Sequence, residues 1–363
     1  MQGCPVLEID LGKITENAEQ VVEKCREKGI QVLGVTKGFS AMHQIVNAML
    51  AGGIEELADA RMENIVELRK QNIHNPVTLL RIPRLSNVDN VVQYANTSIN
   101  SEVAVIKALA AASVRSGKVH NIILMVDLGD LREGIMEENV LDTAEQICGL
   151  PGVTVVGLGT NMGCFGGILP SVDNLGILAK LRHDLERHLG HRLDIVSGGG
   201  TSTLLLVEND MVPMGINQLR IGEGILLGTD TTNNRKIPWL HQDAFTLRAE
   251  VIEVKDKPSM PIGEVGKDAF GNTPKFVDIG IRKRAILALG KQDVYIEGVF
   301  PLEGDFNILG ASSDHTIIDI TDTSKEIAVG DEVVFGLTYP GLLSVSDSRY
   351  VRKQFKGGKE YEN

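Results

Sequence analysis

Cysteine is scarce in this sequence, and its spacing matches neither a metal site nor a disulfide pattern. The four cysteines, Cys4, Cys25, Cys148 and Cys164, are scattered along 363 residues without a CxxC pair. This spacing argues against a zinc knuckle and a disulfide framework, and it is typical of proteins from a reducing compartment. The first residues also lack a basic stretch followed by an apolar core, so we expect no secretory signal. The sequence thus predicts a cytoplasmic protein without a metal site.

Positive charge and long apolar runs are lacking as well. Lysine and arginine together number 36 against 48 aspartates and glutamates, which gives a formal net charge of −12. Binding to a phosphate backbone needs clustered basic residues, so we expect no nucleic-acid partner. No stretch approaches the ~20 consecutive apolar residues of a membrane span, so we expect no membrane partner. With 43% hydrophobic and 23% charged residues, the composition is that of an ordinary soluble globular protein.

Strand-like and helical patterns alternate up to about residue 235. Strand-like apolar runs lie at 31–36, 54–59, 77–81, 97–100, 121–127, 153–160, 193–197 and 215–221. Helical periodicity lies at 12–28 before them, and between them at 40–51, 62–72, 86–95, 101–116, 138–149, 171–189 and 201–208. Alternation indicates a parallel sheet, and eight strands indicate closure into a (β/α)8 barrel of the TIM type. A doubly wound open sheet is the competing α/β architecture, since one miscounted strand would remove the eightfold pattern.

The pattern changes after about residue 240. Short strand candidates follow one another at 246–255, 275–281, 284–289, 294–297, 306–309, 316–320 and 332–335, separated by Gly, Pro and Asp. Helical periodicity disappears, so we predict a second, smaller all-β domain at the C-terminal end. We place the barrel at 11–235 and the β-domain at 236–363, and we expect a lone strand within residues 1–10 to join the β-domain.

The first buried strand ends in a lysine. Val32, Leu33 and Val35 suit a strand buried on both faces, Lys37 follows directly, and Ser40 can cap the next helix. In α/β folds ligands bind at this carboxyl edge of the sheet. A desolvated lysine there can lose its proton and attack a carbonyl carbon to form a Schiff base. The alternative is a loop lysine that extends into water.

Other polar residues stand at the ends of the predicted strands, where a barrel would bring them together. They are Asp59, Arg61, Arg81, Arg132, Asn161, Ser197 through Ser202, and Arg220. A basic rim in an acidic protein indicates a small anionic ligand. The alternative is that Arg61 and Arg81 only pair with local carboxylates.

Two glycine-rich turns follow the last two predicted strands. The first contains Gly199, Gly200, Thr201 and Ser202, and the second contains Gly222 and Glu223. Such turns expose backbone N–H groups at a helix start, which suits a phosphate, and barrel enzymes often bind phosphate after strands seven and eight. The alternative is a tight turn that merely needs positive φ, which explains one or two glycines better than three.

Together with further segments, these residues give the chain a family resemblance that extends over nearly its whole length. The chain resembles the fold-type III racemases that depend on pyridoxal 5'-phosphate (PLP), and within them the alanine/ornithine racemase branch. The segments that carry the resemblance are 7–11, 34–37, 126–134, 219–228 and 310–321, in this order and at these spacings.

The resemblance implies a role for each site residue. Lys37 is the catalytic lysine that holds PLP, Arg220 faces the pyridine nitrogen, and Arg132 binds the substrate carboxylate. The phosphate is held by the two turns, and Asn161 and Asp314 contribute to substrate binding. An arginine against the pyridine nitrogen cannot readily donate a proton, which favours racemisation over transamination.

The second catalytic base is where the sequence departs from the family pattern. In typical alanine racemases a tyrosine of the β-domain serves, and the corresponding stretch 278–282 has Ile281 at that position. A histidine expected near the end of the sixth strand is replaced by Asn161. Tyr339, Asp314 and His315 are candidates for the missing base; the structural alternative for Tyr339 is that it anchors a turn before Pro340.

The resemblance therefore implies an isomerase, an amino-acid racemase that interconverts L- and D-forms by moving the Cα proton. The replaced residues and the branch resemblance favour ornithine, lysine or another longer side chain over alanine. A broad substrate range that includes alanine stays open. The family's arrangement also implies a homodimer whose β-domain completes the neighbour's site. Two alternatives stay open: a non-catalytic PLP carrier, and a fold-type III decarboxylase or aldolase.

Overall fold

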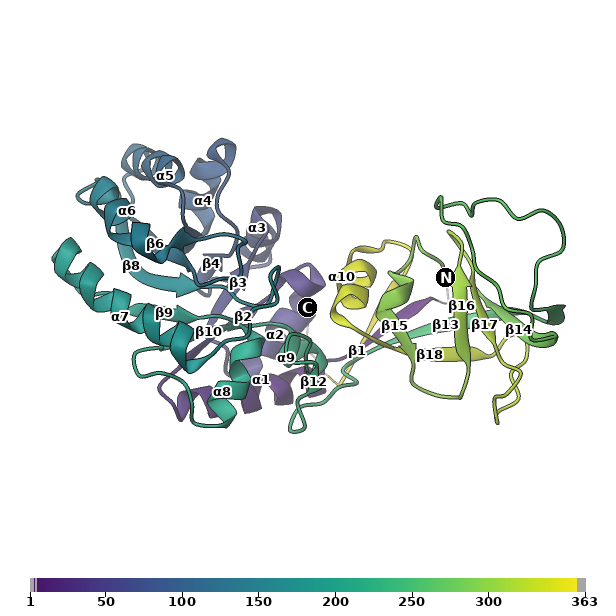
Figure 1. The fold of residues 1–363 in the computed structure, drawn as a ribbon. Coiled ribbons are helices and arrows are strands. Elements are labelled where there is room, and N and C mark those ends of the chain that lie inside the picture. Colours follow the sequence, from purple (N-terminus) through teal and green to yellow (C-terminus); the bar gives the residue numbers. More distant parts are fainter. Residues whose placement is uncertain (1–2, 4, 358–363) are drawn as a thin grey trace. The chain divides into compact units, whose positions relative to one another are not determined.

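The computed structural model describes residues 3 and 5–357, and the chain divides into two compact units (Figure 1). One unit comprises Leu11–Gln242, and the other comprises the residues up to Asp10 together with those from Asp243 onward. The first unit thus extends past the expected boundary at 235–236. The reason is that β12 (Arg235–Lys236) pairs with β11 (Thr229–Asp230) inside that unit.

Eight parallel strands of the first unit close into a barrel. They are β2 (Gln31–Val35), β3 (Glu56–Asp59), β4 (Val77–Leu79), β5 (Thr97–Asn100), β6 (His120–Asp127), β8 (Val153–Thr160), β9 (Ile195–Gly198) and β10 (Gln218–Ile221). Each pairs with the next along the chain, and β10 returns to β2, so the sheet closes. A short strand, β7 (Ile135–Met136), lies beside the end of β6. The predicted barrel is confirmed, and the open doubly wound sheet was the wrong alternative.

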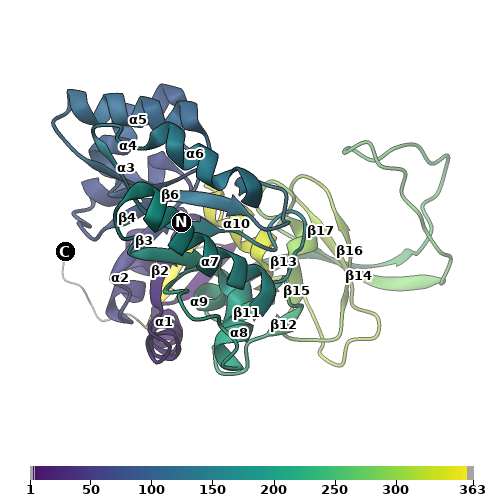
Figure 2. The ribbon, with the colours of Figure 1, turned by 60° about the vertical axis from the view of Figure 1, so that its left-hand side comes forward.

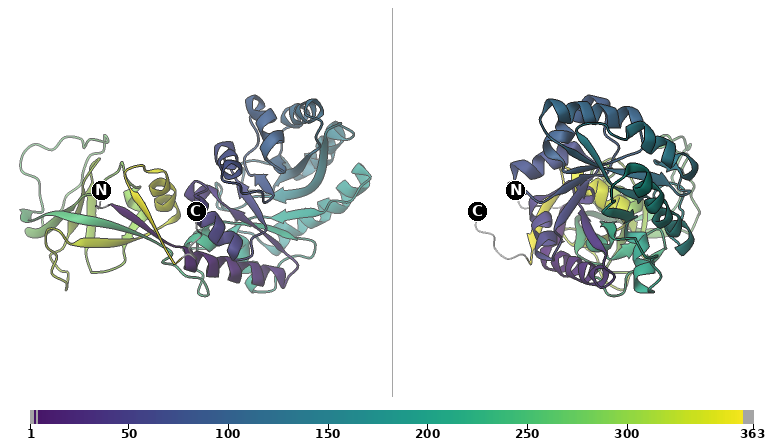
Figure 3. Two further views of the ribbon diagram at one scale, coloured as in Figure 1. Left: turned by 180° about the vertical axis from the view of Figure 1, so that it is seen from behind. Right: turned by 90° about the vertical axis from the view of Figure 1, so that its left-hand side faces the viewer.

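Helices lie outside these strands (Figure 3). They are α1 (Leu11–Arg26), α2 (His43–Ala51), α3 (Met62–Lys70), α4 (Val88–Tyr94), α5 (Val103–Arg115), α6 (Val140–Ile147), α7 (Val172–Leu189), α8 (Leu204–Glu208) and α9 (Glu223–Leu227). Ser171 and Asn174 form a capping box at the start of α7, and Gly190 ends it at φ +70°. Ser40 does not cap α2 as predicted, because it adopts a left-handed conformation and Met42 takes the capping position.

Alternate strand residues fill the barrel interior. Leu33 and Val35 of β2 pack with Ala58 and the partly buried Leu80. Gly34 between them faces outward, since a Cβ there would come 2.9 Å from the Met49 side chain of α2. Arg220 lies opposite Leu33 in the β2–β10 register, so side chains at these two positions share one face of the sheet. The strand period therefore directs Arg220 into the barrel.

Within the described residues, the second unit consists of mostly antiparallel strands and one α-helix. The strands are β1 (Val6–Asp10), β13 (Phe245–Pro258), β14 (Ile281–Leu287), β15 (Val299–Pro301), β16 (Asn307–Ala311), β17 (Thr316–Asp319), β18 (Glu332–Leu337) and β19 (Arg352–Lys356). Their order is β15-β18-β13-β14-β17-β16, and β1 pairs antiparallel with β13 and parallel with β19. The predicted β-rich domain is confirmed, and its single helix, α10 (Tyr339–Asp347), was not predicted.

The strand expected at 275–281 does not form. Apart from Ile281, which begins β14, this segment belongs to a long loop that extends away from the strands of its unit (Figure 2). The Asp278 carboxylate accepts the Ser259 hydroxyl at 3.3 Å and the Gly280 N–H at 3.1 Å, and Gly280 has φ +82°. These contacts hold a turn at the base of the loop, which a strand pairing would break.

Several absences concern the described residues only. None of the helices in residues 5–357 has the length and apolar character needed to cross a membrane. The same part of the chain contains no cluster of three or more His, Cys, Asp or Glu placed to hold a metal ion. Cys25, Cys148 and Cys164 are free thiols, and Cys4 lies outside the described residues.

Candidate active site

Lys37 begins a 3-10 turn, η1 (Lys37–Phe39), directly beyond the end of β2. The lysine is half-buried between the buried residues Thr36 and Gly38. Burial, with smaller contributions from Arg132 and Arg220, lowers the pKa of its amine, while Cys164 and Asp59 oppose the shift. A larger share of the amine is therefore neutral and nucleophilic than for a lysine in water.

The backbone after Lys37 is strained. Ser40 and Ala41 have φ values of +53° and +52°, a region that residues with a Cβ rarely occupy. The Ala41 N–H nevertheless returns to the Thr36 carbonyl at 3.2 Å, which closes the turn around the lysine. Strain of this kind persists only where surrounding contacts impose it, and it concentrates at functional sites.

Asp59, predicted as a strand-end residue, fixes the lysine turn rather than facing a ligand. Its carboxylate accepts the Thr36 hydroxyl at 2.5 Å, the Arg61 N–H at 2.7 Å and the Asn64 amide at 3.1 and 3.2 Å. Burial raises the pKa of this carboxyl, and the hydrogen bonds oppose that shift. Asp59 thus ties the end of β2 to the end of β3.

Arg61 and Arg81 are exposed. The pKa of Glu63 is lowered chiefly by its own backbone N–H, and the guanidinium groups of Arg84, Arg81 and Arg61 add to this effect. These arginines act on a surface carboxylate of α3, so we do not include them in the site.

Arg220 is buried among the strand ends of β8, β9 and β10. Its Nη1 donates to Ser197 Oγ at 2.5 Å, and its Nη2 donates to the Thr160 carbonyl at 2.6 Å. Burial lowers the pKa of the guanidinium to about 10, so it remains charged at neutral pH. Two contacts from two neighbouring strands hold the planar group in one orientation.

Arg132 lies in the loop after β6 and pairs with its neighbour Glu133. Arg132 Nε and Nη2 donate to the two carboxylate oxygens, the second at 2.5 Å, and this pairing raises the pKa of the guanidinium. With the Asn161 amide oriented so that its oxygen faces Arg132, that oxygen accepts from Nη2 at 3.2 Å and from the Met162 N–H at 3.2 Å. The two predicted substrate residues are therefore in contact. Glu133 was not predicted.

Asp130 connects the Arg132 loop to the loop after β8. Its carboxylate, 2% exposed, accepts the N–H groups of Gly163, Phe165 and Gly166 at 3.0 to 3.1 Å. Asp127 accepts the Gly129 and Leu131 N–H groups at 2.9 and 3.1 Å within the first loop. The position of Arg132 thus depends on two buried carboxylates.

The two glycine turns contact each other. The Gly224 N–H donates to Thr201 Oγ1 at 3.2 Å, which joins the turn after β10 to the turn after β9. A Cβ on Gly200 would come 3.1 Å from the Arg220 carbonyl, and a Cβ on Gly222 would come 3.1 Å from Val35 Cβ. Gly199 has φ +100°. The left-handed backbone at Gly199 and the close approaches at Gly200 and Gly222 thus favour glycine in these turns.

Glu223 was predicted in the second turn, but its side chain points to the following segment. The carboxylate accepts the Thr229 hydroxyl at 2.7 Å and the Thr231 hydroxyl and N–H at 2.6 and 3.0 Å, and burial raises its pKa. Ser202 is 5% exposed, and its carbonyl accepts the Asn233 amide at 3.0 Å. At Glu223 and Ser202, therefore, the backbone N–H groups rather than the side chains are the donors that suit a phosphate.

Asp314, His315 and Tyr339 belong to the second unit. Asp314 and His315 are exposed in the turn between β16 and β17, and the Ser312 N–H closes this turn on the His315 carbonyl at 2.8 Å. Tyr339 is half-buried at the start of α10. Their roles remain predictions.

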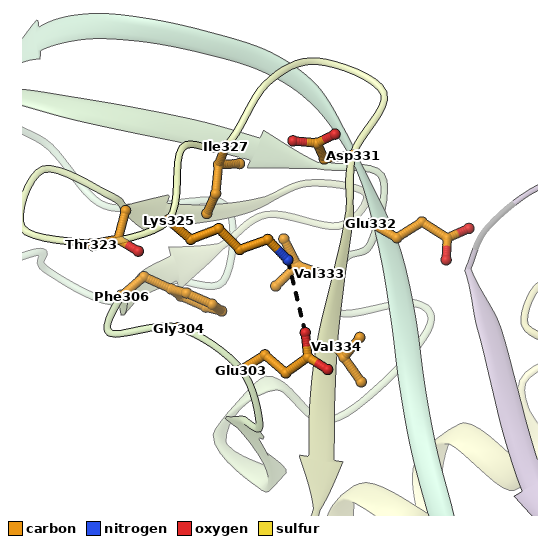
Figure 4. Close-up of a pocket in the computed structure, with 10 residues that line it drawn as sticks. All are labelled: Glu303, Gly304, Phe306, Thr323, Lys325, Ile327, Asp331, Glu332, Val333 and Val334. Carbon is orange, nitrogen blue, oxygen red and sulfur yellow. Dashed lines mark ion pairs between the residues drawn. The ribbon is translucent and has the colours of Figure 1, made fainter.

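A hollow in the second unit (Figure 4) differs in its chemistry from the strand-end site of the barrel. Lys325 and Glu303 face each other across it with Nζ and Oε2 3.9 Å apart, and their side chains are 69% and 67% exposed. Its apolar side includes Phe306, which meets Phe335 edge-on with ring centroids 5.9 Å apart. A solvent-screened ion pair over an apolar floor offers no activated nucleophile, so the barrel holds the candidate active site.

A closed barrel has a half-buried lysine at the end of β2, and a buried arginine and two glycine turns at the neighbouring strands β10 and β9. This arrangement defines a barrel enzyme with an activated lysine. Residues 9–229 match the family described as "Alanine racemase, N-terminal domain". The chain belongs to this family.

Relatives cover nearly the whole chain. It is 40% identical to the ornithine racemase of Acetoanaerobium sticklandii over 96% of this chain and 99% of that protein. It is 43% identical to the lysine racemase of Thermotoga maritima over 97% of this chain and 98% of that protein. An alanine racemase structure from Streptomyces lavendulae covers 99% of both chains at a TM-score of 0.78 and 16% identity, a likeness of fold alone. These findings support the predicted racemase, an isomerase, over the carrier and the decarboxylase or aldolase.

Proposed function

We propose that this protein is a PLP-dependent racemase of basic amino acids, with ornithine and lysine as its preferred substrates. The observation that carries the proposal is Lys37, whose amine has a lowered pKa at the end of β2 and within electrostatic reach of Arg132 and Arg220. The substrate class is supported by the names of the two relatives at 40% and 43% identity.

The residues of the barrel fit PLP. Lys37 Nζ would hold it covalently, and the adjoining turns at Gly199–Ser202 and Gly222–Glu223 would receive its phosphate on backbone N–H groups and the Thr201 hydroxyl. The close approaches at Gly200 and Gly222 support this assignment, because added Cβ atoms would crowd both turns. When bound, PLP supplies an electron-withdrawing ring that makes the Cα proton of an attached amino acid removable.

Lys37 then acts as one catalytic base. Because burial favours the neutral form of its amine, Nζ can accept the Cα proton from one face of the substrate. Arg220 would present a guanidinium of fixed orientation to the ring, since Ser197 and the Thr160 carbonyl hold that group in place. A guanidinium cannot readily give up a proton, so it limits side reactions that need a protonated ring.

Arg132 and Asn161 orient the substrate. The Arg132 guanidinium binds the α-carboxylate, and the Asn161 oxygen at 3.2 Å from Nη2 helps to fix that guanidinium. Racemisation also needs a base on the opposite face of Cα. Tyr339, Asp314 and His315 stay the candidates for this role, with Asp314 also a candidate for substrate contact.

The remaining parts of the proposal are a homodimer with shared sites and a cytoplasmic location. The three described cysteines are free thiols, which suits a reducing compartment. Two residues of the family pattern, the tyrosine and the histidine, are absent here, which supports a longer substrate side chain than that of alanine.

The test is substitution of Lys37 by alanine. The purified protein, incubated with PLP and single L-amino acids, should form D-enantiomers that chiral chromatography resolves. Borohydride should fix PLP to Lys37, and Lys37→Ala should lose both the adduct and the D-product, whereas Lys70→Ala, at an exposed lysine of α3, should lose neither. A covalent adduct that persists on another lysine contradicts the assignment, and amine or aldehyde products would favour a decarboxylase or aldolase.

A further inference from the structure

Glu133 forms an ion pair with Arg132 at the active-site loop and has capacity left for another donor. Its two oxygens accept from Arg132 Nε and Nη2, and its side chain is 16% exposed. A carboxylate offers about four acceptor positions. Of the residues that the structure describes, Arg132 alone donates to Glu133, so the carboxylate can accept from a second cation without releasing the first.

Two buried carboxylates near the site, Asp59 and Asp130, already have several donors each. Asp59 is fully buried and accepts from the Thr36 hydroxyl, the Arg61 N–H and the Asn64 amide. Asp130 is likewise occupied by three backbone N–H groups. Glu133 differs from both, because it combines partial exposure with a single partner.

Glu133 also lies within the electrostatic field of the site. Its charge acts on Arg220 and opposes the lowering of that residue's pKa, while Arg132 acts on Lys37. The pair therefore presents one cation and one anion side by side, close to the amine that reacts. Arg132 Nη1 stays outside the pair, so the guanidinium can bind a carboxylate while Glu133 remains in place.

We propose that Glu133 is the specificity-determining residue that binds the side-chain ammonium group of a basic amino acid, while Arg132 binds its α-carboxylate. This assignment rests on the proposed racemase function and gives that site its substrate preference. A basic amino acid carries a carboxylate and a distal ammonium, the complement of the Arg132–Glu133 pair. Without an anion, the guanidinium groups of Arg132 and Arg220 would repel that ammonium.

The test compares substrates that differ only in the distal amine. Ornithine is compared with norvaline, and lysine with norleucine, in the holoenzyme with Glu133→Gln. We expect the ratio of kcat/KM for ornithine over norvaline to fall roughly 10- to 100-fold, the range of a lost hydrogen bond to a charged group. The kcat/KM for norvaline should fall by a smaller factor. Norvaline is affected only by the loosening of Arg132, whereas ornithine also loses the contact of its ammonium group with Glu133. Glu133→Asp should recover part of the ratio.

Two control variants make the outcome specific. Glu138→Gln removes an exposed charge from the same segment and should leave the ratio unchanged. Asp314→Asn removes the other predicted substrate carboxylate. An equal fall for all substrates in Glu133→Gln overturns the assignment and leaves Glu133 as a positioning residue for Arg132. A ratio that changes in Asp314→Asn and not in Glu133→Gln overturns it in favour of Asp314.

The same assay separates this inference from the function on which it depends. A wild-type enzyme that racemises no amino acid contradicts the proposed function. A wild-type enzyme that is active, with a ratio insensitive to Glu133, contradicts the Glu133 assignment alone.

Discussion

His120, the first residue of β6, is a buried residue whose neutral state matters for stability. It is 2% exposed, its Nε2 lies 2.8 Å from Ser98 Oγ, and burial lowers its pKa from 6.5 to about 4. Between these values the unfolded chain binds a proton that the folded chain does not, so lower pH favours unfolding. The contribution of neutral His120 to the free energy of unfolding is fully present above about pH 6.5. As the pH falls toward 4, this contribution, roughly 3 kcal/mol in total, is lost.

His120→Gln should therefore flatten the pH dependence of stability in this range. The measurement is the free energy of unfolding in urea at pH 7.5 and pH 4.5, where wild type should lose more between the two values than the variant. His183→Gln, at a side chain that is 78% exposed, is the control and should behave as wild type. Equal losses in wild type and His120→Gln would show that other groups govern this acid range.

The role of a single residue could be predicted where it follows from the residue's place on a strand. It could not be predicted where it depends on which other side chain the residue contacts. Lys37 and Arg220 stand at the ends of strands whose period is visible in the sequence, so their approach to one ligand edge followed from the barrel. Glu133 was missed, because a glutamate next to an arginine in a loop does not reveal whether the two side chains pair. The role of Asp59 depends on Thr36 and Asn64, from two other positions, which no local pattern links.

At the scale of elements, the two glycine turns provide a test of the phosphate assignment. Gly200→Ala or Gly222→Ala places a Cβ 3.1 Å from its nearest neighbour, so the turn or that neighbour must move by a few tenths of an ångström. Such a shift moves the N–H donors of the turn, and we expect PLP affinity, measured by absorbance titration, to fall by roughly three- to tenfold. An unchanged affinity would remove these turns from the cofactor site.

Gly176 supplies the matched control. It lies inside α7, and a Cβ there would meet nothing within 4 Å. Gly176→Ala should leave PLP affinity unchanged and stabilise the protein by about 0.5–1 kcal/mol, the helix preference for alanine over glycine. The pair of results separates crowding in the turns from a general effect of glycine substitution.

The elements of the barrel were predictable because periodicity reports burial directly. Strands buried on both faces are apolar runs, and the helices between them keep one apolar face. The predicted start of α2 was wrong because Ser40 lies in a left-handed conformation within the turn around Lys37, and Met42 takes the capping position. Helix α10 was missed because its nine residues are few and Pro340 near its start resembles a turn, although proline is tolerated in a first helical turn.

At the scale of the whole molecule, the β-rich unit exposes apolar side chains in and beside its long loop. Ile262, Val277, Ile279 and Ile281 are 92%, 75%, 59% and 64% exposed. Exposed apolar side chains close together along one segment are candidates for contact with a partner chain. This observation supports the proposed homodimer, which light scattering of the purified protein can check. Sequence alone implied the dimer only through resemblance, since a single chain carries no record of its partner.

Shared sites predict that two inactive variants restore activity to each other. One parent is Lys37→Ala, and the other is whichever of Tyr339→Phe, Asp314→Asn and His315→Gln abolishes racemisation. If a site takes Lys37 from one subunit and the other residue from its partner, each mixed dimer contains one intact site. Random exchange makes about half of the dimers mixed, so activity should return to about a quarter of wild type after co-refolding. Sites contained within single chains would stay inactive in every mixture, because each carries one of the two substitutions.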